Sequence, residues 1–287
     1  MTTLLMPKKS PARVWHCAGR VLDLSRPLVM GILNVTPDSF SDGGEHNTLE
    51  AALAWARKMR DEGAVIIDVG GESTRPHALP VSLEEERRRV MPVVHLLVAE
   101  GMVVSVDTSR PEIMREAAAA GAAILNDVRG FELPGAASAA ATTDCGLVIM
   151  HKGKPTTEDA VGEIARYLRA RQEALEGLGV DSSRICWDPG YGFGKSLEVN
   201  LELLAATPRL VASGQPVMTA VSRKGSLGKL IGREGTEARI VASVAAALLA
   251  AHSGARILRV HDVRETMDAL AVLQGFEGAQ TRLQSAD

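Results

Sequence analysis

Polar side chains of the kinds that bind and orient a small polar molecule follow several short apolar runs of this chain. Asp107, Asn126 and Asp188 each come at or just after such a run, and Lys224 follows another. Carboxylate and amide oxygens accept hydrogen bonds, whereas amide and ammonium groups donate them. The set therefore matches the edge of an amino-pyrimidine-like ring, with Lys224 available to donate to a carbonyl oxygen.

A second group of residues suits an anionic leaving group. It contains Arg75, Arg259, His261 and Asn34. Guanidinium groups pair with phosphate oxygens through two parallel hydrogen bonds, and a carboxamide oxygen is a suitable ligand for Mg²⁺ that keeps most of its waters. We therefore expect a pyrophosphate-like group and a magnesium ion at Asn34.

Each of these residues alone also has a structural interpretation. Asp107 precedes Pro111 and would serve as a helix N-cap, and Asp127 and Asp262 would serve as loop or cap residues. What favours a binding site is that all eight predicted strands end in such residues. Burying carboxylates, amides and a lysine together costs several kcal/mol unless they pair or bind a ligand.

The elements that must position these side chains alternate regularly along the chain. The run from Leu28 to Leu33 is a typical buried parallel strand, and it ends abruptly at Asn34 in a polar, turn-rich segment that reaches Gly44. The predicted strands are Leu28 to Leu33, Val65 to Val69, Val103 to Val106, Ile124 to Asn126, Leu147 to Met150, Ile185 to Trp187, Val217 to Ala220 and Ile257 to Val260. The predicted helices are Leu49 to Asp61, Leu83 to Glu100, Pro111 to Ala120, Pro134 to Thr143, Glu158 to Leu178, Leu197 to Ala212, Thr236 to His252 and Val263 to Gln274.

Eight strand and helix units without an intervening linker predict an α/β fold, the (β/α)8 TIM barrel, with a short N-terminal β-hairpin. We expect a single domain over residues 1–287, with an extension and hairpin in 1–27 and the barrel in 28–275. The hairpin, around Cys17 to Arg20, should plug one end of the barrel. The alternative is a doubly wound open sheet, but its G-x-G-x-x-G fingerprint is missing because Lys195 occupies the last glycine position.

Composition excludes several classes of function. The net charge of −3, the pI near 6.2 and 3% aromatic residues give no reason to expect nucleic acid or an anionic membrane as partner. The three cysteines are far apart, which argues against a disulfide framework and a zinc site. No secretion signal or membrane-spanning segment is evident, so we expect a cytoplasmic protein.

Seven motifs resemble those of the dihydropteroate synthase family of pterin-binding barrel enzymes, in order and over nearly the whole length. They are MGILNVTPDSFSDGG at Met30 to Gly44, IIDVGGESTRP at Ile66 to Pro76, SVDTSRPE at Ser105 to Glu112, ILNDVRGF at Ile124 to Phe131, DPGYGFGK at Asp188 to Lys195, SRKG at Ser222 to Gly225, and RVHDV at Arg259 to Val263.

The resemblance implies a reaction and a cofactor. 6-Hydroxymethyl-7,8-dihydropterin pyrophosphate would lose pyrophosphate, and p-aminobenzoate would attack the methylene carbon to give 7,8-dihydropteroate for tetrahydrofolate biosynthesis, with Mg²⁺ held at Asn34. A homodimer is also implied, which we expect to form through the small-residue helix Thr236 to His252.

The resemblance also assigns roles to residues of this chain. The pterin site comprises Asp107, Asn126, Asp188, Lys224, Met150 and Phe193; the pyrophosphate site Asn34, Thr74, Arg75, Arg259 and His261; and the p-aminobenzoate site Thr36, Ser39, Phe40, Pro76, Phe193, Lys224 and Ser226. Catalytic roles fall to Asn34, Asp38, Arg75, Lys224, Arg259 and His261. Residues 36–44 are expected to act as a lid.

Three positions depart from the family pattern. Gly225 replaces a common serine, the strand-5 motif from Met150 to Pro155 is one residue short, and His77 stands where glycine is common. Two alternatives stay open: a methyltransferase that moves a methyl group from a methylated folate to a corrinoid protein, and a non-catalytic pterin-binding paralogue. The segments with T-P-D-S-F and S-T-R-P and the pair Arg259 and His261 favour the synthase over the methyltransferase. The intact set of polar residues at the strand ends argues against the paralogue.

Overall fold

Eight parallel strands form one barrel-shaped sheet, as the sequence predicts. The computed structural model describes residues 12–35, 44–72 and 81–284, with only the backbone of 44–48. The strands are β3 (Leu28–Asn34), β4 (Ile66–Gly70), β5 (Val103–Asp107), β6 (Ile124–Asp127), β7 (Gly146–Met150), β8 (Ile185–Asp188), β9 (Met218–Thr219) and β10 (Ile257–Val260). Their order is β8, β7, β6, β5, β4, β3, β10 and β9, and a parallel bridge between Trp187 and Val217 joins the two ends of this sheet.

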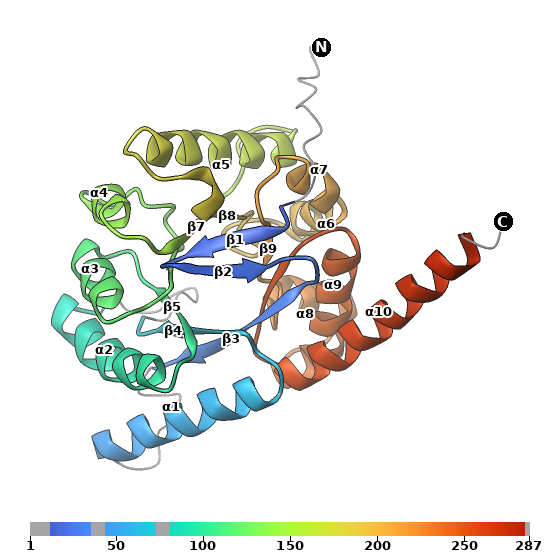
Figure 1. Ribbon diagram of the computed structural model, residues 1–287. Coiled ribbons are helices and arrows are strands. Elements are labelled where there is room, and N and C mark those ends of the chain that lie inside the picture. Colours follow the sequence, from blue (N-terminus) through green and yellow to red (C-terminus); the bar gives the residue numbers. More distant parts are fainter. Residues whose placement is uncertain (1–11, 36–43, 73–80, 285–287) are drawn as a thin grey trace.

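Helices surround the sheet (Figure 1) because each strand returns to its parallel neighbour through a helical crossover. The α-helices are α1 (Gly44–Asp61), α2 (Leu83–Ala99), α3 (Pro111–Ala119), α4 (Ala136–Ala141), α5 (Ala160–Glu176), α6 (Leu197–Ala205), α7 (Thr207–Val211), α8 (Gly225–Ile231), α9 (Ile240–His252) and α10 (Val263–Gln284). Two 3₁₀ turns lie at Ser182–Arg184 and Glu237–Arg239.

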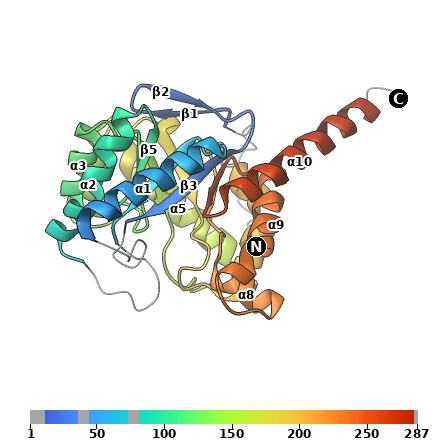
Figure 2. The same cartoon turned by 90° about the horizontal axis from the view of Figure 1, so that it is seen from below.

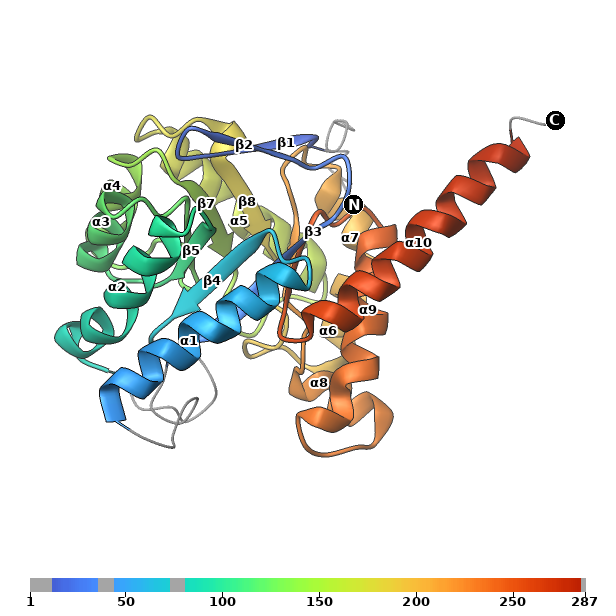
Figure 3. The same cartoon turned by 60° about the horizontal axis from the view of Figure 1, so that its bottom comes forward.

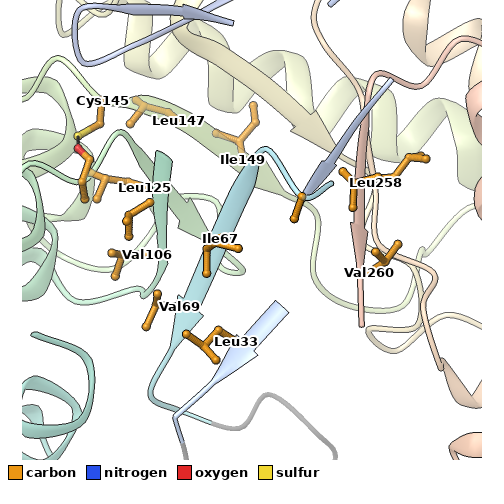
Figure 4. Close-up of a cluster of buried hydrophobic side chains, with 14 of the residues drawn as sticks. Leu33, Ile67, Val69, Val106, Leu125, Cys145, Leu147, Ile149, Leu258 and Val260 are labelled. Atoms are coloured by element: carbon orange, nitrogen blue, oxygen red, sulfur yellow. Dashed lines mark hydrogen bonds between the residues drawn. The ribbon is translucent and has the colours of Figure 1, made fainter. Parts of the chain in front are cut away.

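Side chains alternate between the two faces of each strand, and this separates two layers of core. Outward residues such as Leu33, Ile67, Val106 and Leu258 belong to the main hydrophobic cluster, which the helices complete (Figure 4). Inward residues form a second cluster inside the barrel, at the end where the strands begin. Its strand members are Met30, Ile66, Ile124, Val148, Cys186, Met218 and Ile257.

The N-terminal hairpin closes this end of the barrel, which confirms the prediction. It consists of β1 (Val14–Cys17) and β2 (Arg20–Asp23) and lies across the sheet in Figure 3. Trp15 and Leu24 are buried against the inward cluster, and the Trp15 indole Nε1 donates to the carbonyl of Arg184 at 2.8 Å. The turn is tight, with left-handed φ angles at Ala18 and Gly19. The hairpin therefore covers the end of the barrel at which the strands begin.

Several helix boundaries differ from the predictions. The helix predicted over Leu197 to Ala212 is divided into α6 and α7 because Pro208 has no N–H and occupies the first turn of a new helix. The helix predicted over Thr236 to His252 starts as a 3₁₀ turn, and α8 was not predicted as a separate helix.

The last helix is longer than predicted. The prediction stopped at Gln274, where the apolar period ends, but α10 continues to Gln284 and projects away from the body beside α9 (Figure 2). Most of its additional residues are exposed, and Phe276 and Glu277 contact His252 at the end of α9. None of the described helices combines the length and apolarity needed to cross a membrane.

Candidate ligand-binding rim of the barrel

The inward positions of the strands bring the predicted ring-binding residues to one end of the barrel. On β3, inward Met30 is followed two and four residues later by Ile32 and Asn34, and on β6 inward Ile124 is followed by Asn126. The same period places Asp107, Met150 and Asp188 inward at the ends of β5, β7 and β8. The polar residues thus converge at the carboxyl ends of the strands, where barrel enzymes have their active sites.

Arg259 lies between two carboxylates at this rim. Its Nε donates to Asp68 Oδ2 at 2.7 Å, and its Nη2 donates to Asp107 Oδ2 at 2.8 Å. Burial lowers the pKa of Arg259, but the charges of Asp68 and Asp107 outweigh it and raise this pKa above its usual value. The guanidinium is consequently a permanent cation held in a fixed plane.

Asp107 is not a helix cap, so that interpretation of its position is wrong. The N-cap residue of α3 is Arg110, which makes no side-chain capping bond, while the Asp107 carboxylate faces Arg259. Burial raises the pKa of Asp107 to about 7. The positive charge of Arg259 lowers this pKa, and the negative charge of Asp68 raises it further. Asp127, in contrast, ends β6 and stabilises the loop that follows, where it accepts from the backbone N–H groups of Arg129 and Phe131 at 2.8 and 2.7 Å.

Asp188 and the segment after it form one wall of the rim. Asp188 Oδ1 accepts from the backbone N–H of Gly190 at 2.7 Å, and burial raises the pKa of this carboxyl. Gly190 has a φ of +73°, and a Cβ there would lie 2.0 Å from the carbonyl oxygen of His151. Only glycine permits this close approach between the segments that follow β7 and β8.

Lys224 reaches the rim from the segment after β9. Its Nζ lies 4.3 Å from the centre of the Phe193 ring, a cation–π contact. Burial, with the nearby charge of Arg259, lowers the pKa of Lys224 to about 8. The preceding residue, Arg223, has a left-handed φ of 56° and donates through Nε to Asp262 at 3.1 Å, which holds this strained turn in place.

His261 is a neutral group, although the sequence placed it in a cationic cluster. Burial and the charges of Arg259 and Arg223 lower its pKa to about 3. Its Nδ1 lies 3.0 Å from the hydroxyl oxygen of Ser222, and its backbone N–H donates to the same oxygen at 3.1 Å. At neutral pH this residue supplies a hydrogen bond and not a charge.

Asn34 lies beside Asp107, across a glycine. A Cβ built at Gly70 would be 3.5 Å from Asp107 Cβ and 3.9 Å from Asn34 Oδ1. Among the described residues no group of three His, Cys, Asp or Glu side chains is placed to hold a metal ion. A single carboxamide oxygen next to open rim fits a magnesium ion that arrives with a phosphate group and keeps its waters.

Two residues of the rim were not assigned to the site from sequence. Asp68 is buried, and its signal in the sequence is a carboxylate inside the apolar run Ile66 to Val69. Lys195 is buried and donates through Nζ to the carbonyls of His151 at 3.0 Å and Gly190 at 2.7 Å, so it ties two rim segments together. Its signal in the sequence is its place as the last residue of the DPGYGFGK motif.

The remaining predicted residues lie outside the described part of the chain, or at its margin. Outside it are Thr36, Asp38, Ser39, Phe40, Thr74, Arg75, Pro76 and His77, with the predicted lid at 36–44 except for the backbone of Gly44. Ser226 lies half-buried in α8.

Comparison with known proteins identifies close relatives of the chain. The family model described as "Pterin binding enzyme" matches residues 30–261. The dihydropteroate synthase of Escherichia coli K12 is 47% identical over 271 residues, which cover 91% of this chain and 96% of that protein.

Solved structures agree with the sequence comparison. The Xanthomonas albilineans dihydropteroate synthase with 4-aminobenzoic acid has a TM-score of 0.89 and 52% identity, covering 93% of this chain and 98% of that one. A structure from the same organism in complex with 7,8-dihydropteroate has a TM-score of 0.85 and 48% identity, covering 93% of this chain and 99% of that one.

Proposed function

The chain belongs to the dihydropteroate synthase family of pterin-binding enzymes, and on that premise we propose how its rim carries out the reaction. It condenses 6-hydroxymethyl-7,8-dihydropterin pyrophosphate with p-aminobenzoate to give 7,8-dihydropteroate and pyrophosphate. The solved relatives with 4-aminobenzoic acid and with 7,8-dihydropteroate support these ligands. The identity of about half of all residues to synthases supports this function over a corrinoid methyltransferase.

The observation that carries the proposal is the set of inward acceptors facing a buried amine. Asp107, Asn126 and Asp188 offer oxygen acceptors from three strand ends, and Lys224 offers a donor. A pterin ring presents amino and ring N–H donors along one edge and a carbonyl oxygen beside them, which is the complementary pattern. Met150 and Phe193 would contact the faces of the ring.

The reaction needs no covalent intermediate with the protein. The bond between the methylene carbon and the pyrophosphate oxygen breaks, and its electron pair leaves with the pyrophosphate. The resulting cation is delocalised into the dihydropterin, where the negative charges of Asp188 and of the two carboxylates that flank Arg259, Asp68 and Asp107, stabilise it. The aminobenzoate nitrogen then forms the new C–N bond and loses its proton.

The pyrophosphate site would contain Asn34, Arg259 and His261, with Thr74 and Arg75 from the adjacent segment. Arg259 supplies a permanent positive charge, and neutral His261 supplies a hydrogen bond. Asn34 would hold Mg²⁺, which neutralises charge on the departing pyrophosphate. Asp38, in the segment after β3, completes the proposed catalytic set.

The aminobenzoate site would lie next to the pterin, between Lys224 and the segments after β3 and β4. Phe193 and Ser226 are its described members, with Thr36, Ser39, Phe40 and Pro76 as its other predicted members. Gly225 stands where the family commonly has a serine, and Ser226, the next residue along α8, would supply the hydroxyl.

We further propose a single pterin-binding barrel domain that acts as a cytoplasmic homodimer. Exposed apolar side chains gather on the neighbouring helices α9 and α10, including Val241, Leu249, Val272 and Phe276. An apolar surface of this kind favours an interface between copies of the chain. Light scattering of the purified protein should give twice the chain mass, and a monomer would contradict this proposal.

Pyrophosphate release tests the catalytic proposal. Purified protein is given the pterin pyrophosphate with and without p-aminobenzoate and Mg²⁺, and released pyrophosphate and dihydropteroate are measured. We expect release that depends on both additions and dihydropteroate equal to the pyrophosphate formed. Absence of both products would overturn the synthase assignment.

A further inference from the structure

We propose that Asp68 is a positioning residue that sets the orientation of both Arg259 and Asn126. The inference rests on the proposed function, since those two residues are assigned to the pyrophosphate and pterin sites. Asp68 lies in β4, one inward position below Gly70, and none of its surface is exposed. It therefore acts on a ligand through other side chains.

One oxygen of Asp68 receives both hydrogen bonds. Asp68 Oδ2 accepts from Arg259 Nε at 2.7 Å and from Asn126 Nδ2 at 3.2 Å, whereas Oδ1 has no partner among the described residues. A buried carboxylate oxygen without a partner costs free energy, so a purely structural role would be poorly served by this residue. Its position between Arg259 and Asn126 instead suits a role in orienting these two side chains.

For Arg259, Asp68 determines the plane of the guanidinium. The group is bonded through Nε to Asp68 on β4 and through Nη2 to Asp107 on the neighbouring strand β5. A single bond to Asp107 would leave the guanidinium free to turn about it. With two bonds, its remaining N–H groups keep one direction, which electrostatic stabilisation of a leaving group requires.

For Asn126, Asp68 selects which end of the carboxamide faces the ligand. A carboxylate only accepts hydrogen bonds, so the amide nitrogen must point toward Asp68. The amide oxygen is then left for the pocket as an acceptor. Asp68 thereby makes Asn126 specific for an N–H donor on the pterin edge, and an uncharged amide at position 68 would lose this selection.

Asp68→Asn tests the inference, with Ser105→Ala as the matched control. Ser105 pairs with Asp68 in the β4–β5 register, is equally buried and has no hydrogen-bond partner for its hydroxyl among the described residues. We expect kcat/KM for the pterin pyrophosphate to fall about 100-fold in Asp68→Asn, with turnover of the control close to wild type. Equal values for the two variants would overturn the proposal.

A double-mutant cycle separates positioning from general damage. If Asp68 acts through Arg259, adding Asp68→Asn to an Arg259→Lys enzyme should have a much smaller effect on pyrophosphate release than it has in wild type. A second cycle combines Asp68→Asn with Asn126→Ala and measures affinity for 6-hydroxymethyl-7,8-dihydropterin, which lacks the pyrophosphate. It tests the contact between Asp68 and Asn126. Independent, multiplicative losses in both cycles would contradict the inference.

Crystal structures of the variants test the role of Asp68 separately from the synthase activity. A wild-type protein without turnover would refute the synthase assignment, but the orientations in Asp68→Asn can still be compared with wild type. We expect the Arg259 plane to turn and the Asn126 amide to lose its fixed orientation, and unchanged orientations would overturn the proposal. If Asp68→Asn does not fold, Asp68→Ser, which is smaller and retains an acceptor, replaces it.

Discussion

The two ends of the barrel are built by the same strands but differ in the polarity of their inward side chains. At the amino end, inward Met30, Ile66 and Ile124 pack with Trp15 and Leu24 of the hairpin in one buried apolar cluster. At the carboxyl end, the inward positions two and four residues later carry carboxylates, amides and a guanidinium. One end closes the fold, and the other carries the chemistry.

The difference shows how the molecule separates stability from function. Burial of apolar side chains at the amino end contributes about 25 cal/mol per Å² removed from water. The carboxyl end instead keeps buried polar atoms without partners among the described residues, such as Asp68 Oδ1 and His151 Nδ1. Stability gained at the amino end thus offsets the cost of the buried polar atoms at the carboxyl end.

The largest expected effect is on stability, at the amino end. Trp15→Ala removes a fully buried indole and its hydrogen bond to Arg184, so we expect a loss of about 3–5 kcal/mol in the free energy of unfolding. The folded fraction should still bind pterin within about twofold of wild type. Urea unfolding and calorimetry measure the two quantities, and a large loss of pterin affinity would show that the ends are not independent.

The next effect is on binding, at the carboxyl end. Asp188→Ala and Lys224→Ala each remove a buried charged partner of the ring, and we expect pterin affinity to fall about 100-fold or more. A fall in melting temperature is also expected for Asp188→Ala, because the backbone N–H of Gly190 loses its acceptor. Lys229→Ala, on the exposed side of α8, is the control. Unchanged pterin affinity would refute the assignment of these residues.

A pH series tests the role of Lys224 at the carboxyl end without mutation. The pKa of Lys224 is lowered to about 8, so pterin affinity should decrease above pH 8 as the ammonium loses its proton. The unfolded chain holds that proton up to about pH 10.4. Between these values the unfolded state binds more protons, and the contribution of Lys224 to the free energy of unfolding rises with pH.

Calorimetry with the pterin between pH 6.5 and 9.5 measures the first effect, and urea unfolding over the same range measures the second. Affinity that stays constant to pH 9.5 would exclude Lys224 as a charged donor to the ring.

The smallest expected effect is the loss of stability on removing a local cap at the amino side of the barrel. Asp181 accepts from the backbone N–H of Ser183 at 2.8 Å, just before β8 begins. Asp181→Ala should lower the free energy of unfolding by about 1 kcal/mol and leave kcat/KM unchanged. Denaturant unfolding with a parallel activity assay checks this, and altered kinetics would show that the amino side influences the rim.

Local patterns in the sequence predicted most of the fold. Glycines with left-handed φ at 63, 121 and 254 end helices directly before β4, β6 and β10, and each is a local signal of a strand to come. The length of α10 was missed because its last residues have no apolar period. The division at Pro208 was missed because apolar residues continue across it.

The sequence by itself determined the eightfold alternation and which side chains stand at the strand ends, because both follow from neighbouring residues and from the two-residue period of a strand. Only the tertiary structure decided how those side chains pair. Arg259 meets Asp68 across 191 positions of the chain, and burial beside Arg259 makes His261 neutral. These are consequences of closing the barrel, which removes water and brings together charges that no local pattern relates.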